Sequence, residues 1–444
     1  MNKLVGEKIK QLRNEMNMTQ SVLAGNELTK SMLSQIENNI SNPSIKTLQY
    51  IADRLNRPIS YFLEDKQSEV IDNSIISTSI SESQEEKLVV INDLLNNTQV
   101  DKAQKELDSL VSQGALDQNL KMKADLLYKL GKALIGLEQI EVGKNYLSHS
   151  IAVYTEAQLY MEGAKASVEL AKTFYLEMNY EESLNVSEKA FDLYYKNINA
   201  DLMFEIELYH YKILILFAIG DNKAAEDTIK LALELSTKTS IYYKTDELYR
   251  LKAIFHYLKE SKEDFNMSID KALQFAEFTE DNLCLAKIYA VKAVDAFKRS
   301  DLELALEYAE KIKFYANRDM YIYYLVKAQA YYAQGKYDLA YENVLKVDYP
   351  AYEKHKFDYL NMWSSKIYEG LILSKLGKHS EAISAILDGI EKMSFFHYSK
   401  FLVQAYRSLS DVYSEGNDYQ NAFLYLKKAN EIQDIIDKDD TILF

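Results

Sequence analysis

A pattern of small residues that recurs every ~36–42 residues most constrains the fold of residues 84–444. In each copy, a small residue inside one helix is followed by a short polar turn. An aromatic or other side chain comes next, and a second small residue lies three positions later. Such residues let two helices approach closely, and each helical hairpin then buries its apolar face only by stacking on a neighbour. Examples are Gly131 with Gly143, Ala293 with Ala305, Ala328 with Ala340, and Gly370 with Ala382.

The composition agrees with a helical fold. The 444 residues include only 3 prolines and 13 glycines, too few for the turns of a strand-rich protein. We therefore predict an all-α chain with more than one structural unit. Residues 1–65 form a DNA-binding domain, residues 66–83 form a linker rich in Ser, Ile, Asp and Glu, and residues 84–444 form the repeat array. We expect eight hairpins in the array, preceded by an atypical capping hairpin at residues 85–113.

The net charge of −15 is unevenly distributed. Residues 1–66 carry +2, and the rest of the chain carries −17. An acidic body repels phosphate and would confine DNA contact to the N-terminal region. An alternative is that the acidity only keeps a large helical protein soluble, and the sequence leaves both interpretations open.

The first 65 residues predict a bundle of short helices that contains a helix-turn-helix. Thr19 is a suitable N-cap for the second helix, and Thr29 for the third. We expect Val22, Leu23 and Ala24 of the second helix to face inward. We expect the third helix to be anchored by Met32, Leu33 and Ile36, while Lys30, Ser31, Ser34 and Gln35 point outward. Outward polar side chains on this helix are the type that reads base edges in the major groove.

This region resembles the five-helix DNA-binding domain of the phage-repressor (Xre/Cro) family. The matching segments include Met18-Thr19-Gln20, Leu33-Ser34-Gln35-Ile36-Glu37-Asn38 and Asn42-Pro43-Ser44. The resemblance implies that Gln20 and Ser44 contact phosphate, that Lys30, Ser31 and Gln35 read bases, and that Glu37 is structural. The turn from Ala24 to Thr29 is expected to be one residue shorter than in most phage repressors and to lack the usual glycine. A shorter turn of this kind resembles that of the peptide-sensing branch. The DNA-binding candidates are Thr19, Gln20, Lys30, Ser31, Ser34, Gln35, Asn38, Asn42 and Ser44.

The hairpins resemble tetratricopeptide repeats, which implies a right-handed superhelix with a concave surface lined by the first helix of each pair. Cations at intervals with aromatic rings between them suit an extended peptide. The alternative is that the tyrosines form the core between repeats and that the lysines and arginines are solvated. The peptide-binding candidates are Lys132, Lys172, Tyr175, His210, Phe217, Arg250, Tyr257, Gln329, Tyr332 and Arg407, and Asp411 is placed inward with them.

A repressor-type domain joined to such a body resembles the RRNPP family of peptide-responsive regulators. The resemblance implies that a short secreted peptide is imported and binds the concave groove. It also implies a homodimer joined through the repeat body, and a palindromic double-stranded DNA operator whose affinity depends on the peptide.

The sequence offers no catalytic constellation, so we predict neither an enzyme nor a cofactor. Its six histidines include no pair at metal-ligand spacing, and Cys284 is the single cysteine. Cys284 lies between two leucines and is expected to be a buried small side chain. The start of the sequence lacks a secretory signal, and no apolar run is long enough to span a membrane, so a cytoplasmic protein is expected.

Two other functions stay open at this point. The first is an adaptor, or a bifunctional protein, whose body binds or inhibits a response regulator. For a phosphatase activity of that kind, the resemblance implies a glutamine or an acidic residue on an N-terminal helical bundle, for which Gln99, Gln104 and Gln113 are available. The second is a regulator of phage lysogeny or plasmid transfer, which would have similar parts and different target genes.

Overall fold

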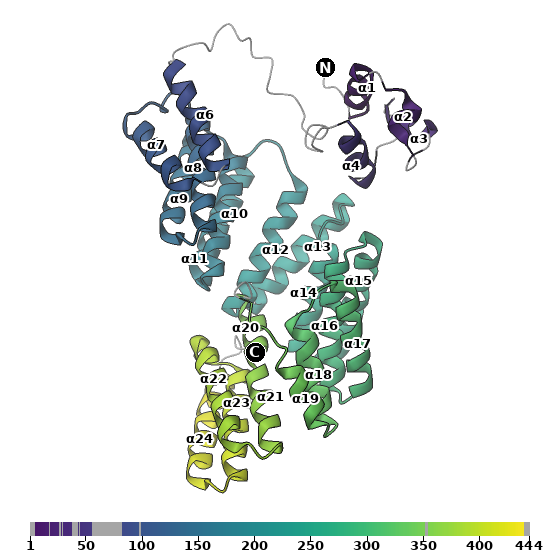
Figure 1. The fold of residues 1–444 in the computed structure, drawn as a ribbon, viewed down its shortest axis with the longest axis vertical. Coiled ribbons are helices and arrows are strands. Elements are labelled where there is room, and N and C mark those ends of the chain that lie inside the picture. The colour runs from purple at the N-terminus through teal and green to yellow at the C-terminus, as the bar shows by residue number, and fades with distance from the viewer. Residues whose placement is uncertain are drawn as a thin grey trace. The chain divides into compact units, whose positions relative to one another are not determined.

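The chain forms two compact units, residues Met1–Glu85 and Glu86–Phe444 (Figure 1). All regular elements of the described residues are helices, so the predicted all-α class is confirmed. None of the helices in these residues is long and apolar enough to cross a membrane. The computed structural model describes residues 5–16, 18–25, 28, 30–37, 43, 45–55, 82–96, 99–350 and 354–438.

The first unit contains the predicted helix-turn-helix. Ile9, Leu23, Leu33 and Ile51 are fully buried and hold its four described helices around one core. The fifth helix, expected at residues 59–63, lies outside the described residues. The four helices are α1 (Val5–Glu15), α2 (Gln20–Ala24), α3 (Lys30–Glu37) and α4 (Ile45–Arg54).

Two residues expected in this core lie on the surface instead. Val22 is 51% exposed and Met32 is 47% exposed. Short helices of five and eight residues bury only part of their circumference. Leu23 and Ala24 of α2, and Leu33 and Ile36 of α3, already occupy the buried positions. The prediction that Val22 and Met32 face inward was therefore wrong.

The turn after α2 also differs from the prediction, because Gly25 provides the glycine that was expected to be missing. Gly25 has φ 59° and ψ −140°, a conformation that side chains with a Cβ rarely adopt. A Cβ atom at this position would lie 2.2 Å from the hydroxyl oxygen of Tyr50. That hydroxyl donates a hydrogen bond to the carbonyl of Ala24, so α4 holds the turn in place.

The second unit consists of nine described helical hairpins and one extra helix, α20 (Lys356–Trp363), which precedes the eighth hairpin directly. The hairpins are α6–α7 (Glu82–Asn96 and Val100–Ser112), α8–α9 (Leu120–Gly136 and Ile140–Glu156), α10–α11 (Tyr160–Leu176 and Tyr180–Lys196), α12–α13 (Leu202–Ile219 and Asn222–Thr239), α14–α15 (Thr245–Leu258 and Lys262–Thr279), α16–α17 (Asn282–Lys298 and Leu302–Ala316), α18–α19 (Tyr321–Ala333 and Tyr337–Val344), α21–α22 (Ser365–Lys375 and His379–Met393) and α23–α24 (Lys400–Glu415 and Tyr419–Ile436).

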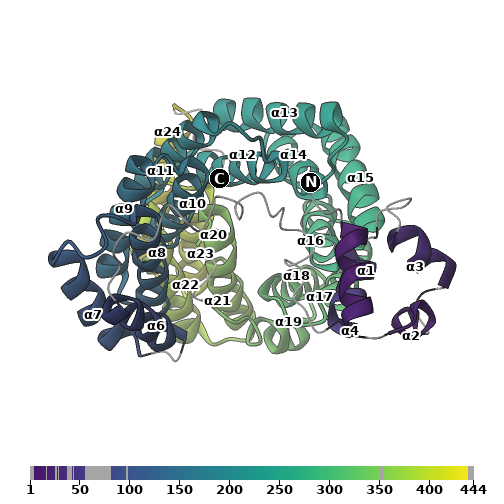
Figure 2. The same ribbon diagram turned by 90° about the horizontal axis from the view of Figure 1, so that it is seen from above.

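The hairpins of this unit stack into a curved body. Figure 2 shows α12, α14, α16 and α18 on its inner side, and α13, α15 and α17 on its outer side. The first helix of each of these pairs therefore lines the concave surface, as expected for tetratricopeptide-like repeats.

Within the hairpins, close contact is made by small residues twelve positions apart. A Cβ atom on Gly143 would lie 2.8 Å from the carbonyl oxygen of Gly131. In the next hairpin, the Ser183 hydroxyl donates to the carbonyl of Ala171 at 2.8 Å. Ala293 and Ala305, in the α16–α17 hairpin, are both fully buried. The recurring small residues thus allow the paired helices to pack backbone against backbone.

Curvature brings together segments that are far apart in the sequence. The hydroxyl of Tyr180, at the start of α11, donates to the carbonyl of Lys354, which lies 174 positions later, at 2.5 Å. The Tyr180 ring also stacks on Phe396 with a centroid distance of 6.3 Å. We call this set of interactions the Tyr180 contact.

We predict that Gly370→Ala destabilises the repeat body by about 1–3 kcal/mol, because overpacking of a tight helix contact has this effect. The added Cβ would lie 2.4 Å from Ile386 Cγ1 and 2.7 Å from the Ala382 carbonyl oxygen. The control is Gly136→Ala at the end of α8, where nothing lies within 4 Å of the added atom. Denaturant unfolding followed by circular dichroism measures both. Equal stability of the two variants would contradict close packing at Gly370.

Candidate functional site

Helix α3 carries the side chains that were predicted to read bases, and three of them are described. Lys30 and Gln35 are exposed, and Ser34 is half-buried. The exposed Met32 lies one turn before Gln35, so an apolar group stands beside the predicted reading residues. Ser31 belongs to α3, but its side chain is outside the described set. Asn38, Asn42 and Ser44 also lie outside the described residues.

The start of α2 is fixed by two polar side chains. The Thr19 hydroxyl accepts a hydrogen bond from the backbone N–H of Val22, so Thr19 is the N-cap of α2, as predicted. The Gln20 amide donates to Glu37 Oε2 at 2.8 Å. This bond ties Gln20, the residue expected to contact phosphate, to the core of the domain.

Glu37 has the structural role that the resemblance implied. Its carboxylate is buried and accepts two hydrogen bonds from Arg13, with Nε–Oε1 2.5 Å and Nη2–Oε2 3.0 Å. The same contact raises the pKa of Arg13. Arg13 also donates to the Met18 carbonyl, so one ion pair connects α1, the start of α2 and the end of α3.

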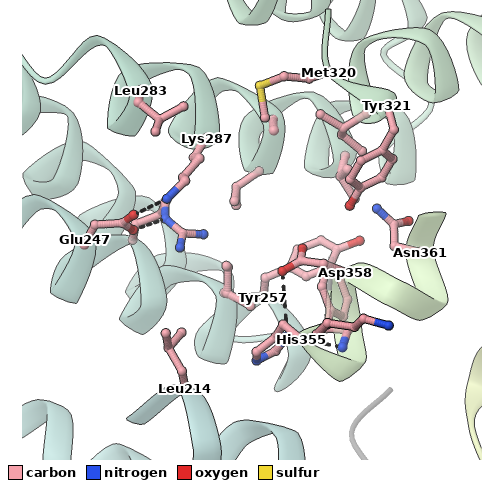
Figure 3. Close-up of a pocket in the computed structure, with 18 of the residues that line it drawn as sticks. Leu214, Glu247, Tyr257, Leu283, Lys287, Met320, Tyr321, His355, Asp358 and Asn361 are labelled. Carbon is pink, nitrogen blue, oxygen red and sulfur yellow. Dashed lines mark hydrogen bonds and ion pairs between the residues drawn. The ribbon is translucent and has the colours of Figure 1, made fainter. Parts of the chain in front are cut away.

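A cavity of about 400 Å³ lies on the concave side of the repeat body (Figure 3). Its volume is within the usual range for ligand pockets of ~300–1,000 Å³. Helices α10, α12, α14, α16, α18 and α20 all contribute side chains to its wall. A site of this kind exists only when the repeats are stacked and curved.

One buried carboxylate organises the polar wall of the cavity. Glu247 of α14 contacts Arg250 on the same helix, with Oε2–Nε 2.5 Å, and Lys287 of α16, with Oε1–Nζ 2.6 Å (Figure 3). The two cations hold the pKa of Glu247 far below its usual range although burial opposes this. The Glu247 carboxylate in turn raises the pKa of Arg250 against the effect of burial. The cluster thus consists of one anion and two cations.

Two histidines in the cavity wall are neutral. Burial lowers the pKa of His210 to about 3 and also lowers the pKa of His355. The Nδ1 atom of His355 accepts a hydrogen bond from the Phe357 N–H at 3.2 Å and caps the start of α20. Since Nδ1 is the acceptor, the ring proton of His355 is assigned to Nε2.

The cavity brings together four of the ten predicted peptide-binding residues, which are Tyr175, His210, Arg250 and Tyr257. They come from α10, α12 and α14, the inner helices of three consecutive hairpins. Their peptide-binding role stays a prediction.

Lys132 and Lys172 lie outside the cavity lining and are paired with acidic residues. Lys132 lies 3.6 Å from Glu169, and Lys172 lies 3.0 Å from Glu169 and 3.7 Å from Glu207. Two lysines and two glutamates therefore neutralise one another along α8, α10 and α12, which leaves no excess charge for a ligand there.

Phe217 was placed wrongly on the concave surface. It is 3% exposed and packs on Phe255, with ring centroids 6.0 Å apart. α12 is apolar around most of its circumference, so its sequence alone did not distinguish the inner surface from the core. Gln329, Tyr332 and Arg407 also lie outside the cavity lining, and Tyr332 packs edge-on against Tyr368.

Several residues of the cavity were not found from the sequence. Glu207, Glu247 and Lys287 follow one another at intervals of 40 residues. This repeat spacing was the sequence signal that could have placed Lys287 on the concave surface. Asp358 and Asn361 lie on α20, the helix that interrupts the repeat pattern, so no register predicted them. Arg318 and Met320 lie in the connection between α17 and α18. Among the described residues, no group of three or more His, Cys, Asp or Glu side chains could hold a metal ion.

We predict that the unfolding free energy falls as the pH is lowered from 7.5 to 5, because unfolded His210 takes up a proton near pH 6.5 and folded His210 does not. Below pH 6.5 this contribution approaches ~1.4 kcal/mol per pH unit. Denaturant unfolding at several pH values should therefore show a shallower pH dependence for His210→Asn. The same substitution at the exposed His149 is the control. An unchanged pH profile for His210→Asn would contradict the neutral state of this residue.

Comparisons with known proteins agree with the two-part organisation. The helix-turn-helix family model matches residues 9–62. No curated protein matches the sequence. The chain is similar in structure to the apo quorum sensor NprR from B. thuringiensis, with 11% identity and a TM-score of 0.51 over 80% of this chain and 100% of that one.

Two further solved structures are similar to this chain over a comparable share of its length. A Rap protein complexed with Competence and Sporulation Factor has 14% identity and a TM-score of 0.52, and 80% of this chain and 98% of that one are covered. Aspartyl phosphate phosphatase F from Bacillus subtilis has 17% identity and a TM-score of 0.51, with 81% and 96% covered. These likenesses identify the fold of the body and agree with the resemblance drawn from the sequence. The chain therefore joins a helix-turn-helix domain to a repeat body with the fold of the RRNPP proteins.

Proposed function

We propose that this chain is a cytoplasmic transcription regulator whose helix-turn-helix domain binds a specific operator and whose repeat body binds a short imported peptide. The observation that carries the proposal is the cavity on the concave surface, in a chain that also has a DNA-binding fold. The NprR similarity supports a sensor of this organisation. The function of the body is then to change the affinity of the protein for DNA.

The wall of the cavity has the chemistry that peptide recognition needs. Tyr257, Tyr321 and Phe357 provide aromatic surface, and Asn361 provides an amide group. Side-chain amides and cations can bond the backbone of an extended peptide, while apolar pockets take its side chains. A peptide in this cavity would contact several repeats at once, because six helices contribute side chains to its wall.

The exposed face of α3 supports base recognition by Lys30, Gln35 and Met32. An amide side chain such as Gln35 can bond adenine through two atoms, and Lys30 can reach guanine. Met32 adds an apolar group for the methyl of a neighbouring thymine. Thr19, Gln20, Ser31, Ser34, Asn38, Asn42 and Ser44 complete the proposed DNA contacts.

We infer a homodimer on a palindromic operator, because repressor-type domains bind paired half-sites that reflect the two-fold symmetry of the protein. A peptide that binds one arrangement of the repeat body more tightly than another shifts the equilibrium toward that arrangement. If the two arrangements place the DNA-binding domains differently, the peptide changes operator affinity by the same coupling free energy.

The experiment that tests the function measures binding of the full chain to the DNA upstream of its own gene. The titration is repeated with C-terminal fragments of any small peptide encoded beside the gene. We expect a peptide to change the DNA affinity in either direction. DNA binding that no such peptide alters would overturn peptide sensing, and absence of specific DNA binding would overturn the regulator itself.

We predict that Gln35→Ala lowers affinity for the operator by about 1–3 kcal/mol without loss of fold, since Gln35 is exposed and the loss is that of one base contact. Fluorescence anisotropy on operator and scrambled DNA measures the effect, which should be confined to the operator. The contrasting variant is Glu37→Ala on the same helix, which leaves Arg13 without its buried partner. It is expected to unfold the domain, at about 3–5 kcal/mol. Wild-type operator affinity of Gln35→Ala would contradict its role.

The alternative function is that of an adaptor whose body binds a response regulator. The similarity to aspartyl phosphate phosphatase F supports this alternative. The three candidate glutamines of the first hairpin all have partners within the chain. Gln99 accepts from Lys102, Gln104 donates to Tyr146, and Gln113 donates to Ser109. Because each amide is already bonded, a catalytic glutamine is less well supported than a binding role.

A further inference from the structure

The cavity wall carries more positive than negative charge, although the chain as a whole has a net charge of −15. With both lining histidines neutral, the lining side chains sum to +2. A concentrated positive charge in a concave apolar surface attracts an anionic ligand and repels a cationic one. The four cations are Arg250, Lys287, Arg318 and Lys354, and the two anions are Glu247 and Asp358.

The excess charge includes one cation, Arg250, whose side chain is largely buried. The side chain of Arg250 is 14% exposed and that of Glu247 is 12% exposed, while Lys287 is 38% exposed. A single carboxylate cannot neutralise two cations, and a buried charge without a full counter-charge is unfavourable unless something else compensates it. Asp358 is the other carboxylate of the lining and its charge also acts on Arg250, but two carboxylates still leave two of the four lining cations without a counter-charge.

The two cations retain hydrogen-bond donors for a further acceptor. Arg250 contacts Glu247 through Nε, so the two terminal nitrogens of its guanidinium are not used by that contact. Lys287 has three N–H donors, of which Glu247 takes one. A guanidinium fork beside an ammonium group is the arrangement that suits a carboxylate.

Apolar side chains surround these donors. They come from α14, α16, α18 and α20 and include Ile254, Leu283, Val291, Val294, Ile322 and Phe357. A fully polar anion, such as inorganic phosphate, would leave this surface without a partner. A ligand that fills the cavity therefore needs apolar groups next to its negative charge.

We propose that the cavity selects a peptide segment in which a carboxylate lies beside apolar side chains, with Arg250 and Lys287 as the residues that bind the carboxylate. Glu247 is a positioning residue that holds both cations at the wall. The carboxylate is either the C-terminus of the peptide or the side chain of an Asp or Glu. This inference rests on the proposed peptide-binding function and adds the chemical class of the ligand.

The test uses four pools of synthetic hexapeptides and the full-length protein. All four are built from Leu, Ile, Val, Phe, Ser and Asn. Their C-termini are either free or amidated, and one position holds either Asp or Asn. Binding is followed by isothermal titration calorimetry and by the shift in the thermal unfolding midpoint. We expect the amidated pool without Asp to bind at least about tenfold more weakly than the best pool with a carboxylate.

The Arg250→Gln variant tests the site itself. It leaves Glu247 paired with Lys287, so this carboxylate keeps a cationic partner in the cavity wall. We expect this variant to lose affinity for the carboxylate pools by at least about tenfold, with no change for the amidated pool without Asp. Lys287→Gln is the second variant if Arg250→Gln does not reach the wild-type unfolding midpoint. The control is Lys230→Gln on the outer helix α13, which removes the same charge from a side chain that is 75% exposed.

The outcomes separate this inference from the function on which it rests. If no pool binds, peptide binding itself is wrong. If all pools bind equally well, or if neither cation variant affects the carboxylate pools, peptide binding stands and carboxylate selection is wrong. Preference for the free C-terminus or for Asp in the amidated peptide identifies which carboxylate the site reads.

Discussion

Close packing of two helices at small residues twelve positions apart is the constraint on which the repeat body depends. At Gly131, Gly143 and Gly370, backbone atoms of the paired helix come so near that an added Cβ atom would require a shift. Each hairpin is therefore a thin rigid unit, and its remaining apolar surface can be buried only against the next one. The curvature of the body follows from this repetition rather than from any single interface.

The Tyr180 contact shows what the accumulated curvature does. It joins α11 to residue 354 across four intervening hairpins and to residue 396 across five, and the neighbouring residues Tyr175 and His355 line the cavity. One side of the cavity thus belongs to the early hairpins and the other to α18 and α20. A ligand that contacts both sides would bind best at one distance between them. Its affinity would therefore depend on the curvature of the whole body. This is the physical basis on which a small peptide can influence a large repeat protein.

The sequence predicted the fold because its signals were local. Short turns, small residues and capping side chains such as Thr19 act within a few positions, and they gave the hairpins and the helix-turn-helix. It was less informative about the cavity, which depends on contacts between distant repeats. Arg250 and Tyr257 were found by repeat register, whereas Asp358 and Asn361 lie on α20, a helix outside that register. Phe217 was misplaced because α12 is apolar on nearly all sides, and Met32 because α3 is too short to bury it.

The shared Glu247 carboxylate would link the stability of the body to the proposed recognition of a ligand in the cavity. One cation paired with Glu247 would be enough for packing. Replacing a buried ion pair by apolar residues of similar volume often leaves a protein just as stable. A second cation beside Glu247 gives no such benefit to the fold, because Arg250 and Lys287 repel one another. An anionic ligand, if the cavity binds one as proposed, would relieve that repulsion and would bind most strongly in the arrangement that holds both cations close together. Because α14 and α16 belong to consecutive hairpins, that arrangement is also a fixed angle between them. Charge compensation by the ligand would therefore favour one curvature of the body over others, which is the differential affinity that a peptide-controlled regulator requires.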